Sequence, residues 1–165
     1  MNNVALSLIS AIFIGLGATL TTDLWALFLK HAFNIAAPNC CLVGRWLRYM
    51  TDGIFKHSNI SSASSKSAEC TVGCAAHYMI GITFTTIFVV IVGNDWLQHP
   101  TPIPAIVFGV VTVLMPFFIM QPAFGLGFAA SKTSNPTQAR FRSLMNHTVF
   151  GAGLYLFGLL VSWLL

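Results

Sequence analysis

Long apolar runs alternate with shorter polar connections along the 165 residues of the chain. A membrane-spanning helix needs about 20 consecutive, mostly apolar residues, and four segments reach that length. No segment remains that is large and polar enough for a soluble domain. The pattern therefore predicts an all-α, polytopic membrane protein in which residues 1–165 form one four-helix transmembrane bundle, with helices over about residues 4–30, 72–93, 103–130 and 144–165.

The longest connection between predicted helices covers about residues 31–71 and has two parts. The first, "CLVGRWLRYMTDGIFKH", interleaves apolar residues with Arg45, Arg48 and Lys56, which predicts a short helix lying on the membrane surface. Basic residues that serve only to set the topology explain the same stretch equally well. The second part, "SNISSASSKS", is rich in serine and predicts a flexible loop.

Composition strengthens the membrane assignment. The chain is 56% hydrophobic and 7% charged, with a mean hydropathy of +0.77, whereas a soluble domain of this size needs far more surface charge. The net charge of +4 raises nucleic acid as a partner. The basic residues, however, are scattered between apolar segments and form no dense stripe, so we expect a lipid bilayer and no nucleic acid.

The basic residues also predict an orientation. All eight lysines and arginines fall in or beside the first and third connections. The positive-inside rule then places these two connections in the cytoplasm and both termini outside. The N-terminus lacks the basic residues that begin a signal peptide, so the first helix is expected to remain uncleaved.

Four cysteines lie on the predicted cytoplasmic side: Cys40, Cys41, Cys70 and Cys74. Stable disulfides are uncommon in that compartment, so we expect free thiols, which argues against a thiol oxidase. Cys70, Cys74 and His77 have the spacing of one helical face. Metal ligation by these residues is an alternative, although C-x3-C-x2-H is not a usual zinc pattern.

Each predicted helix carries a polar residue at a similar depth: Asp23, His77, Gln121 and His147, the last beside Asn146. Asp23 lies seven residues before Lys30, roughly 10 Å inside the end of its helix. An aspartate at the centre of a membrane helix costs at least about 2.5 kcal/mol on insertion scales. We therefore expect these side chains to face inward, with Asp23 accepting a hydrogen bond from His77 or His147.

Three interpretations of this polar cluster remain open. Its hydrogen bonds could serve only to fix helix packing. The cluster could be a proton- or ion-coupled binding site, because intramembrane Asp and His often mark such pathways. Asp23, His77 and His147 could also hold a metal ion. No motif for an organic cofactor is present, so a metal ion is the single cofactor considered.

The third predicted helix contains two prolines, Pro116 and Pro122, in "MPFFIMQP". Each removes a helix hydrogen bond and clashes with the preceding turn. Backbone groups freed at membrane depth must find partners in protein or water. A broken helix of this kind often marks a binding site, whereas a simple kink, helped by the Thr112 hydroxyl, is the structural alternative.

The stretches "GLGATLTTDLWALFLKHAF", "LVGRWLRYMTDGIFKHSNI", "AAHYMIGITF", "MPFFIMQPAFGLGF" and "FRSLMNHTVFGAGLYL" occur in this order. Together they resemble a bacterial integral-membrane family catalogued as domain of unknown function 2938. The resemblance implies a multi-pass protein of the bacterial inner membrane but supplies no activity. The four cysteines depart from the family pattern. The matching motif positions are Asp23, Arg45, Trp46, His77, Gln121, Pro122 and His147.

The leading functional hypothesis is a homo-oligomeric protein that binds or transports a small solute or ion. Asp23 would carry the charge, His77 and His147 would titrate with it, and Gln121 with the broken backbone would orient the solute. Self-association is expected because four helices seldom enclose a pathway. The alternatives are a membrane-embedded metal-dependent enzyme that uses the same residues, and a structural or assembly protein that docks through Arg45 and Trp46.

Overall fold

The computed structural model describes residues 3–164, and within this range it contains helices and turns and no strand. Four of the described helical segments are long and apolar enough to cross a membrane. This confirms the predicted all-helical class and the four apolar segments. The candidate spans are Val4–Phe33, Glu69–Val92, Pro102–Ala123 and Pro136–Ser162.

The chain groups into two compact units. Unit 1 contains residues 1–37, 78–112 and 145–165, and unit 2 contains residues 38–77 and 113–144. Unit 1 holds α1 (Asn3–Phe33), the later part of α3 (Glu69–Val92), α4 (Asn94–Gln98), α5 (Pro102–Val111) and most of α7 (Pro136–Ser162).

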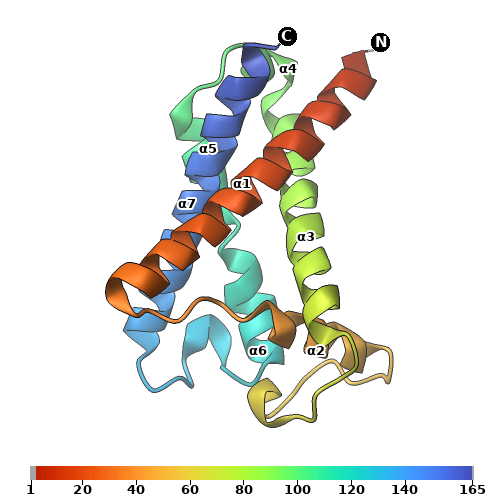
Figure 1. Ribbon diagram of the computed structural model, residues 1–165, viewed down its shortest axis with the longest axis vertical. Helices are drawn as coiled ribbons and strands as arrows, with labels where there is room; N and C mark the ends of the chain where they lie inside the picture. The colour runs from red at the N-terminus through yellow and green to blue at the C-terminus, as the bar shows by residue number, and fades with distance from the viewer. Residues whose placement is uncertain (1–2, 165) are drawn as a thin grey trace. The chain divides into compact units, whose positions relative to one another are not determined.

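Unit 1 is held together by close helix contacts at small residues, and α1 crosses both α3 and α7 there (Figure 1). A Cβ atom added at Gly15 of α1 would lie 2.8 Å from the Cα of Ile82 on α3. A Cβ at Gly153 of α7 would lie 2.7 Å from the Cα of Ala18 on α1. Helices in a bilayer gain little from burying apolar surface, so such close backbone approach is the packing that they require.

The core of unit 1 lies toward the end at which α3 passes into α4. Phe88 is 1% exposed and packs edge-on against Trp96, with ring centroids 4.7 Å apart. The Trp96 indole N–H donates to the carbonyl of Thr101 at 3.1 Å. Gly93, at φ +80°, ends α3 in a conformation that favours glycine and lets α4 begin at Asn94.

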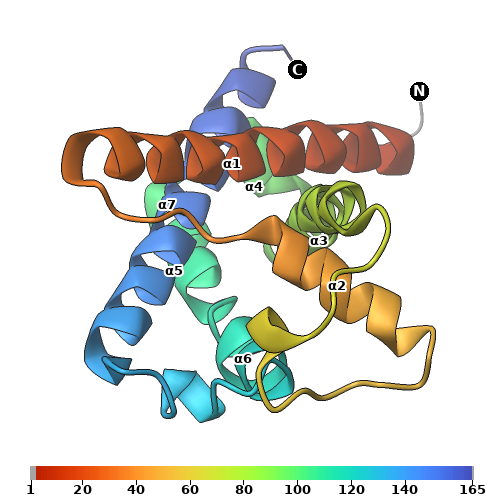
Figure 2. The same cartoon turned by 60° about the horizontal axis from the view of Figure 1, so that its bottom comes forward.

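Unit 2 begins with α2 (Cys40–Met50), which Asn39 caps by accepting a hydrogen bond from the backbone N–H of Cys41. The short 3-10 helix η1 (Ile60–Ser62) follows. Figure 2 shows this turn beside α6 (Gln121–Ala123), which agrees with a 2.8 Å hydrogen bond from the N–H of His57 to the carbonyl of Ala123. The first connection thus contains a short helix, α2. The position predicted for it, on the membrane surface, stays a prediction.

The serine-rich stretch, predicted to be a flexible loop, is instead anchored within unit 2. Asn59 caps η1 through the N–H of Ser61, and Ile60 is 1% exposed. The backbone N–H of Ile60 donates to the carbonyl of Phe124. A buried isoleucine and these hydrogen bonds together hold the segment in place.

Two helix limits differ from those predicted. The last helix starts at Pro136 rather than near residue 144, because Asn135 caps it and Pro136 suits the first turn. These first turns are polar, so the apolar pattern could not predict them as helix. The third predicted helix, expected to reach residue 130, ends at Ala123, because Gly125 and Gly127 turn the chain at positive φ.

Candidate functional site

Asp23 lies on α1 and accepts a hydrogen bond from a phenol on α3. The Oη of Tyr78 donates to Oδ2 of Asp23 at 2.8 Å, and both residues belong to unit 1. Hydrogen bonds to an ionised acceptor are stronger than those between neutral groups. The pair therefore joins two candidate membrane spans through the carboxylate that the sequence singled out.

His147 lies on α7 and contacts Thr112, at the end of α5. His147 Nδ1 and Thr112 Oγ1 are 2.7 Å apart, and the same hydroxyl donates to the carbonyl of Gly109 at 2.6 Å. A hydroxyl has a single proton to donate, so the histidine must supply the proton between Nδ1 and Oγ1. The neutral ring is thereby fixed as the Nδ1–H tautomer.

Close packing keeps this histidine beside the threonine. A Cβ added at Gly109 would lie 2.5 Å from the Cα of Gly151 and 2.6 Å from the carbonyl oxygen of His147. Thr112 is only 6% exposed. The two helices can approach this closely because glycine faces glycine, and this brings Thr112 and His147 together.

Gln121 is 6% exposed in unit 2, and its two amide ends are satisfied unequally. Its Nε2 donates to Oγ of Ser143 over a long 3.4 Å, whereas Oε1 is buried with no hydrogen-bond partner among the described residues. An unsatisfied buried acceptor costs roughly 1–3 kcal/mol. The oxygen is therefore available to a donor that the chain does not itself supply.

The helix break predicted from Pro116 and Pro122 surrounds this glutamine. Pro116 opens the π-helix η2 (Pro116–Met120), and the N–H of Gln121 donates to the carbonyl of Pro116. Pro122 has no N–H to donate to the preceding turn. π-Helical segments within α-helices are frequent at functional sites.

The two units divide the predicted polar cluster. Asp23, Asn146 and His147 belong to unit 1, with Asn146 half-buried beside His147 on α7. His77, also half-buried, and Gln121 belong to unit 2. A single site formed by all of these residues stays a prediction.

Tyr78, a partner of Asp23, is not among the residues predicted from the sequence. It directly follows His77, the polar residue predicted for this helix. A tyrosine in an apolar helix reads as an ordinary aromatic residue unless its partner is known.

Arg45 is the polar centre of unit 2, with its side chain 14% exposed and that of Glu69 12% exposed. Its Nε and Nη2 donate to the two carboxylate oxygens of Glu69 at 2.9 and 2.8 Å. Its Nη1 donates to the carbonyls of Ile60 and Ala63 at 3.2 and 2.8 Å. The hydrogen bonds to Glu69 raise the pKa of Arg45 above its ordinary value, so the guanidinium remains charged.

Trp46 is also engaged within unit 2. Its indole N–H donates to the carbonyl of Phe55 at 2.9 Å, and its ring packs edge-on against Phe124. These contacts give Arg45 and Trp46 a structural role in holding the first connection. The docking role expected of them stays a prediction.

The prediction of four free cysteine thiols is wrong for two of them. Cys41 and Cys70 form a disulfide. The reason is local: α2 and the start of α3 approach so closely that the two Cα atoms are 3.9 Å apart. The Sγ atoms of Cys40 and Cys74 also lie together, 2.6 Å apart.

Within residues 3–164, no three His, Cys, Asp or Glu side chains are grouped so that they could hold a metal ion. A metal ion at Asp23, His77 and His147 stays a prediction from the sequence.

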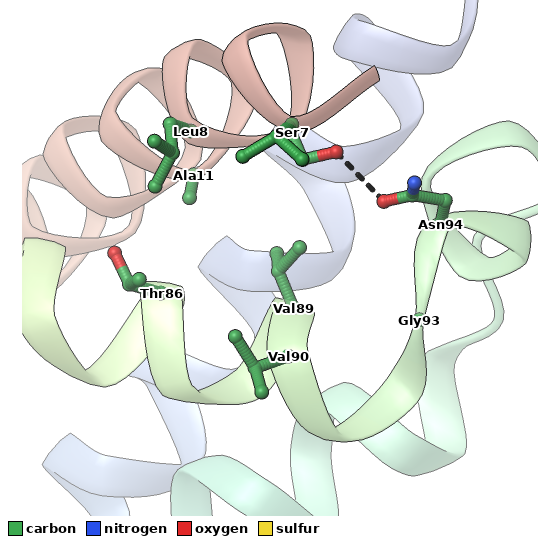
Figure 3. Close-up of a pocket in the computed structure, with 9 residues that line it drawn as sticks. Ser7, Leu8, Ala11, Thr86, Val89, Val90, Gly93 and Asn94 are labelled. Atoms are coloured by element: carbon green, nitrogen blue, oxygen red, sulfur yellow. Dashed lines mark hydrogen bonds between the residues drawn. The ribbon is translucent and has the colours of Figure 1, made fainter. Parts of the chain in front are cut away.

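One cavity of about 300 Å³ opens in unit 1 between α1, the end of α3 and α4 (Figure 3). Its lining is largely apolar, with one hydrogen bond from Ser7 to Oδ1 of Asn94 at 2.7 Å. Ser7 lies sixteen residues from Asp23 on α1, roughly 24 Å along the helix axis. The cavity is therefore separate from the Asp23–Tyr78 pair.

No curated protein and no solved structure matches the chain. A family model does match it, over residues 12–161, and this confirms the resemblance drawn from the sequence motifs. The description of that family assigns no activity. Because the match covers most of its length, the chain belongs to the family described as "Protein of unknown function (DUF2938)".

Proposed function

We propose that the chain is a multi-pass membrane protein that binds and moves a small solute or ion, coupled to proton uptake at Asp23. The observation that carries this proposal is the 2.8 Å hydrogen bond from Tyr78 to Asp23, which joins two helices that could cross a membrane. Intramembrane carboxylates are costly and commonly mark ion or proton pathways. A neutral phenol stabilises the carboxylate without cancelling its charge, so protonation changes the charge of the pair.

His147 supplies a second proton-exchanging group in the same unit. The hydroxyl of Thr112 sets the tautomer of the neutral His147 ring. Histidine changes charge near neutral pH, which suits a group that must both take up and release a proton.

Gln121 supports the binding part of the proposal. Its unpartnered Oε1 can accept from a solute N–H or O–H group or coordinate a cation. The π-helix that precedes it interrupts the regular α-helical hydrogen bonding. Interrupted helices in transporters use such freed backbone groups to coordinate substrates. The substrate class is therefore a small polar molecule with hydrogen-bond donors, or a monovalent cation.

The proposal places the protein in a bacterial inner membrane, with its termini outside and α2 at the cytoplasmic surface. It also includes self-association. Asp23 is an exposed residue in the single chain, and a neighbouring copy would shield its carboxylate from lipid.

The test is proton movement across proteoliposomes that contain purified protein and an internal pH-sensitive dye. A panel of amines, amino acids and monovalent cations is added outside under an imposed pH gradient. Wild type and Asp95→Asn should respond to at least one compound, and Asp23→Asn should not. Full flux in folded Asp23→Asn would contradict the role of Asp23. Absence of flux with every compound, in folded wild-type protein, would contradict transport.

A further inference from the structure

The beginning of α2 and the beginning of α3 cross in contact within unit 2. A Cβ added at Gly44 would collide with the carbonyl oxygen of Glu69, and one at Gly73 would collide with that of Cys40. Both glycines are buried. Two glycines facing each other's helix hold the backbones closer together than any larger residue would allow.

This crossing brings the four cysteines together as two pairs, each joining α2 to α3. Cys41 is bonded to Cys70. One residue earlier on α2 and one turn later on α3, the Sγ atoms of Cys40 and Cys74 are 2.6 Å apart. A disulfide bond is about 2.05 Å long, so the second pair needs only a small movement of its side chains to close.

The two thiols of the second pair differ in access. Cys74 is exposed, whereas Cys40 is half-buried. Attack on an incoming disulfide requires access to the thiolate. Cys74 is therefore placed to react first, and Cys40 is placed to complete the reaction.

We propose that Cys40 and Cys74 form a redox-active dithiol that exchanges with the disulfide of a small thiol compound. The Cys74 thiolate attacks one sulfur of the compound, forming a mixed disulfide and releasing one thiolate. The Cys40 thiolate then attacks Sγ of Cys74, forming the Cys40–Cys74 bond and releasing the second thiolate. The two cysteine thiols give up two protons and two electrons, and the compound is reduced to two thiols.

This site is independent of the proton-coupled transport proposed above, because none of its residues takes part in the Asp23 or His147 pairs. A four-cysteine metal site is the competing explanation of the same cluster. The covalent Cys41–Cys70 bond favours the dithiol, because a metal ion would require those sulfurs as thiolates.

The test uses full-length protein in detergent, reduced and then exposed to glutathione disulfide. Cys40 and Cys41 are adjacent, so peptide mapping of the wild type would leave the pairing ambiguous. Variants with two cysteines remove the ambiguity. Cys41→Ser/Cys70→Ser, which keeps Cys40 and Cys74, should lose two hydrogens by mass and form an internal disulfide. The matched control Cys40→Ser/Cys70→Ser, which keeps Cys41 and Cys74, should cross-link at least about tenfold more slowly.

A third variant separates the two steps. Cys40→Ser in the otherwise intact chain should trap glutathione on Cys74. Two independent glutathione adducts on Cys40 and Cys74 in folded Cys41→Ser/Cys70→Ser would overturn the proposal. So would thiols that stay unreacted in that variant and in folded wild type, or a stoichiometric metal ion bound to the reduced wild-type protein. Folding is checked by gel filtration and far-ultraviolet circular dichroism.

Discussion

The Thr112 hydroxyl lies 2.7 Å from Nδ1 of His147 while it donates to the carbonyl of Gly109. One side chain thus ends a helix and fixes the proton of a histidine on another. The contact depends on the glycine crossing beside it, where Gly109 meets Gly151. Packing and proton chemistry are linked at this position because the helices must touch for the hydrogen bond to form.

Replacing Thr112 with valine should remove this bond while keeping the side-chain shape. We expect a loss of about 1 kcal/mol in the free energy of unfolding, because the ring N–H of the half-buried His147 loses its acceptor. The pH dependence of proton flux should also change, since the tautomer is no longer fixed. Thermal unfolding in detergent and flux against pH measure the two effects.

Thr86→Val is the matched control, because the Thr86 hydroxyl donates to the carbonyl of Ile82 within its own helix. It should change the unfolding free energy by less than about 0.5 kcal/mol. Equal effects of the two substitutions would contradict the account of His147.

Gln121→Leu should separate stability from function. The substitution removes an unsatisfied buried acceptor and a long 3.4 Å hydrogen bond. The free energy of unfolding should therefore stay within about 1 kcal/mol of wild type or rise. Solute-dependent flux should be lost, because the solute has lost its acceptor.

The comparison for Gln121 is made in the same preparation, by thermal unfolding and by the proteoliposome assay. Strong destabilisation of Gln121→Leu together with retained flux would show that the amide serves packing and not binding. Ser143→Ala is the companion variant. It removes the weak partner of Nε2 and should leave flux largely intact.

Arg45→Lys should loosen the first connection. Lysine keeps the charge but cannot span the carboxylate of Glu69 and the carbonyls of Ile60 and Ala63 at once. Amide hydrogen exchange should rise at least about tenfold over residues 57–63. Asp52→Asn is the control: it breaks the exposed Asp52–Lys66 ion pair and should have little effect. Equal exchange in both variants would mean that Arg45 does not hold the loop.

The four apolar segments could be predicted because a membrane-spanning helix is recognised by its length and hydropathy. Their limits could not be predicted equally well. The polar first turns of α7, from Pro136, carry arginines and read as a loop. The loss of helix after Ala123 depends on Gly125 and Gly127 turning against a loop that is distant in sequence, since a Cβ at Gly125 would collide with the carbonyl of Ser58.

Asp23 and His147 could be singled out from the sequence because polar groups in apolar helices must find partners. Which partners they find depends on helix rotation and crossing, which periodicity does not define. Tyr78 and Thr112 therefore emerged only from the packing at small residues. The cysteine pairs could not be predicted for the same reason. They depend on the crossing of α2 and α3 at Gly44 and Gly73, which the sequence does not define.

Proton uptake at Asp23 is tested most directly by infrared difference spectroscopy of the carboxyl band as pH is changed in reconstituted protein. The chain has only four acidic side chains, on Asp23, Asp52, Glu69 and Asp95, so the spectrum is simple. We predict a protonation band that disappears in Asp23→Asn, shifts in Tyr78→Phe and persists in Asp95→Asn. A spectrum unchanged by Asp23→Asn would contradict the account.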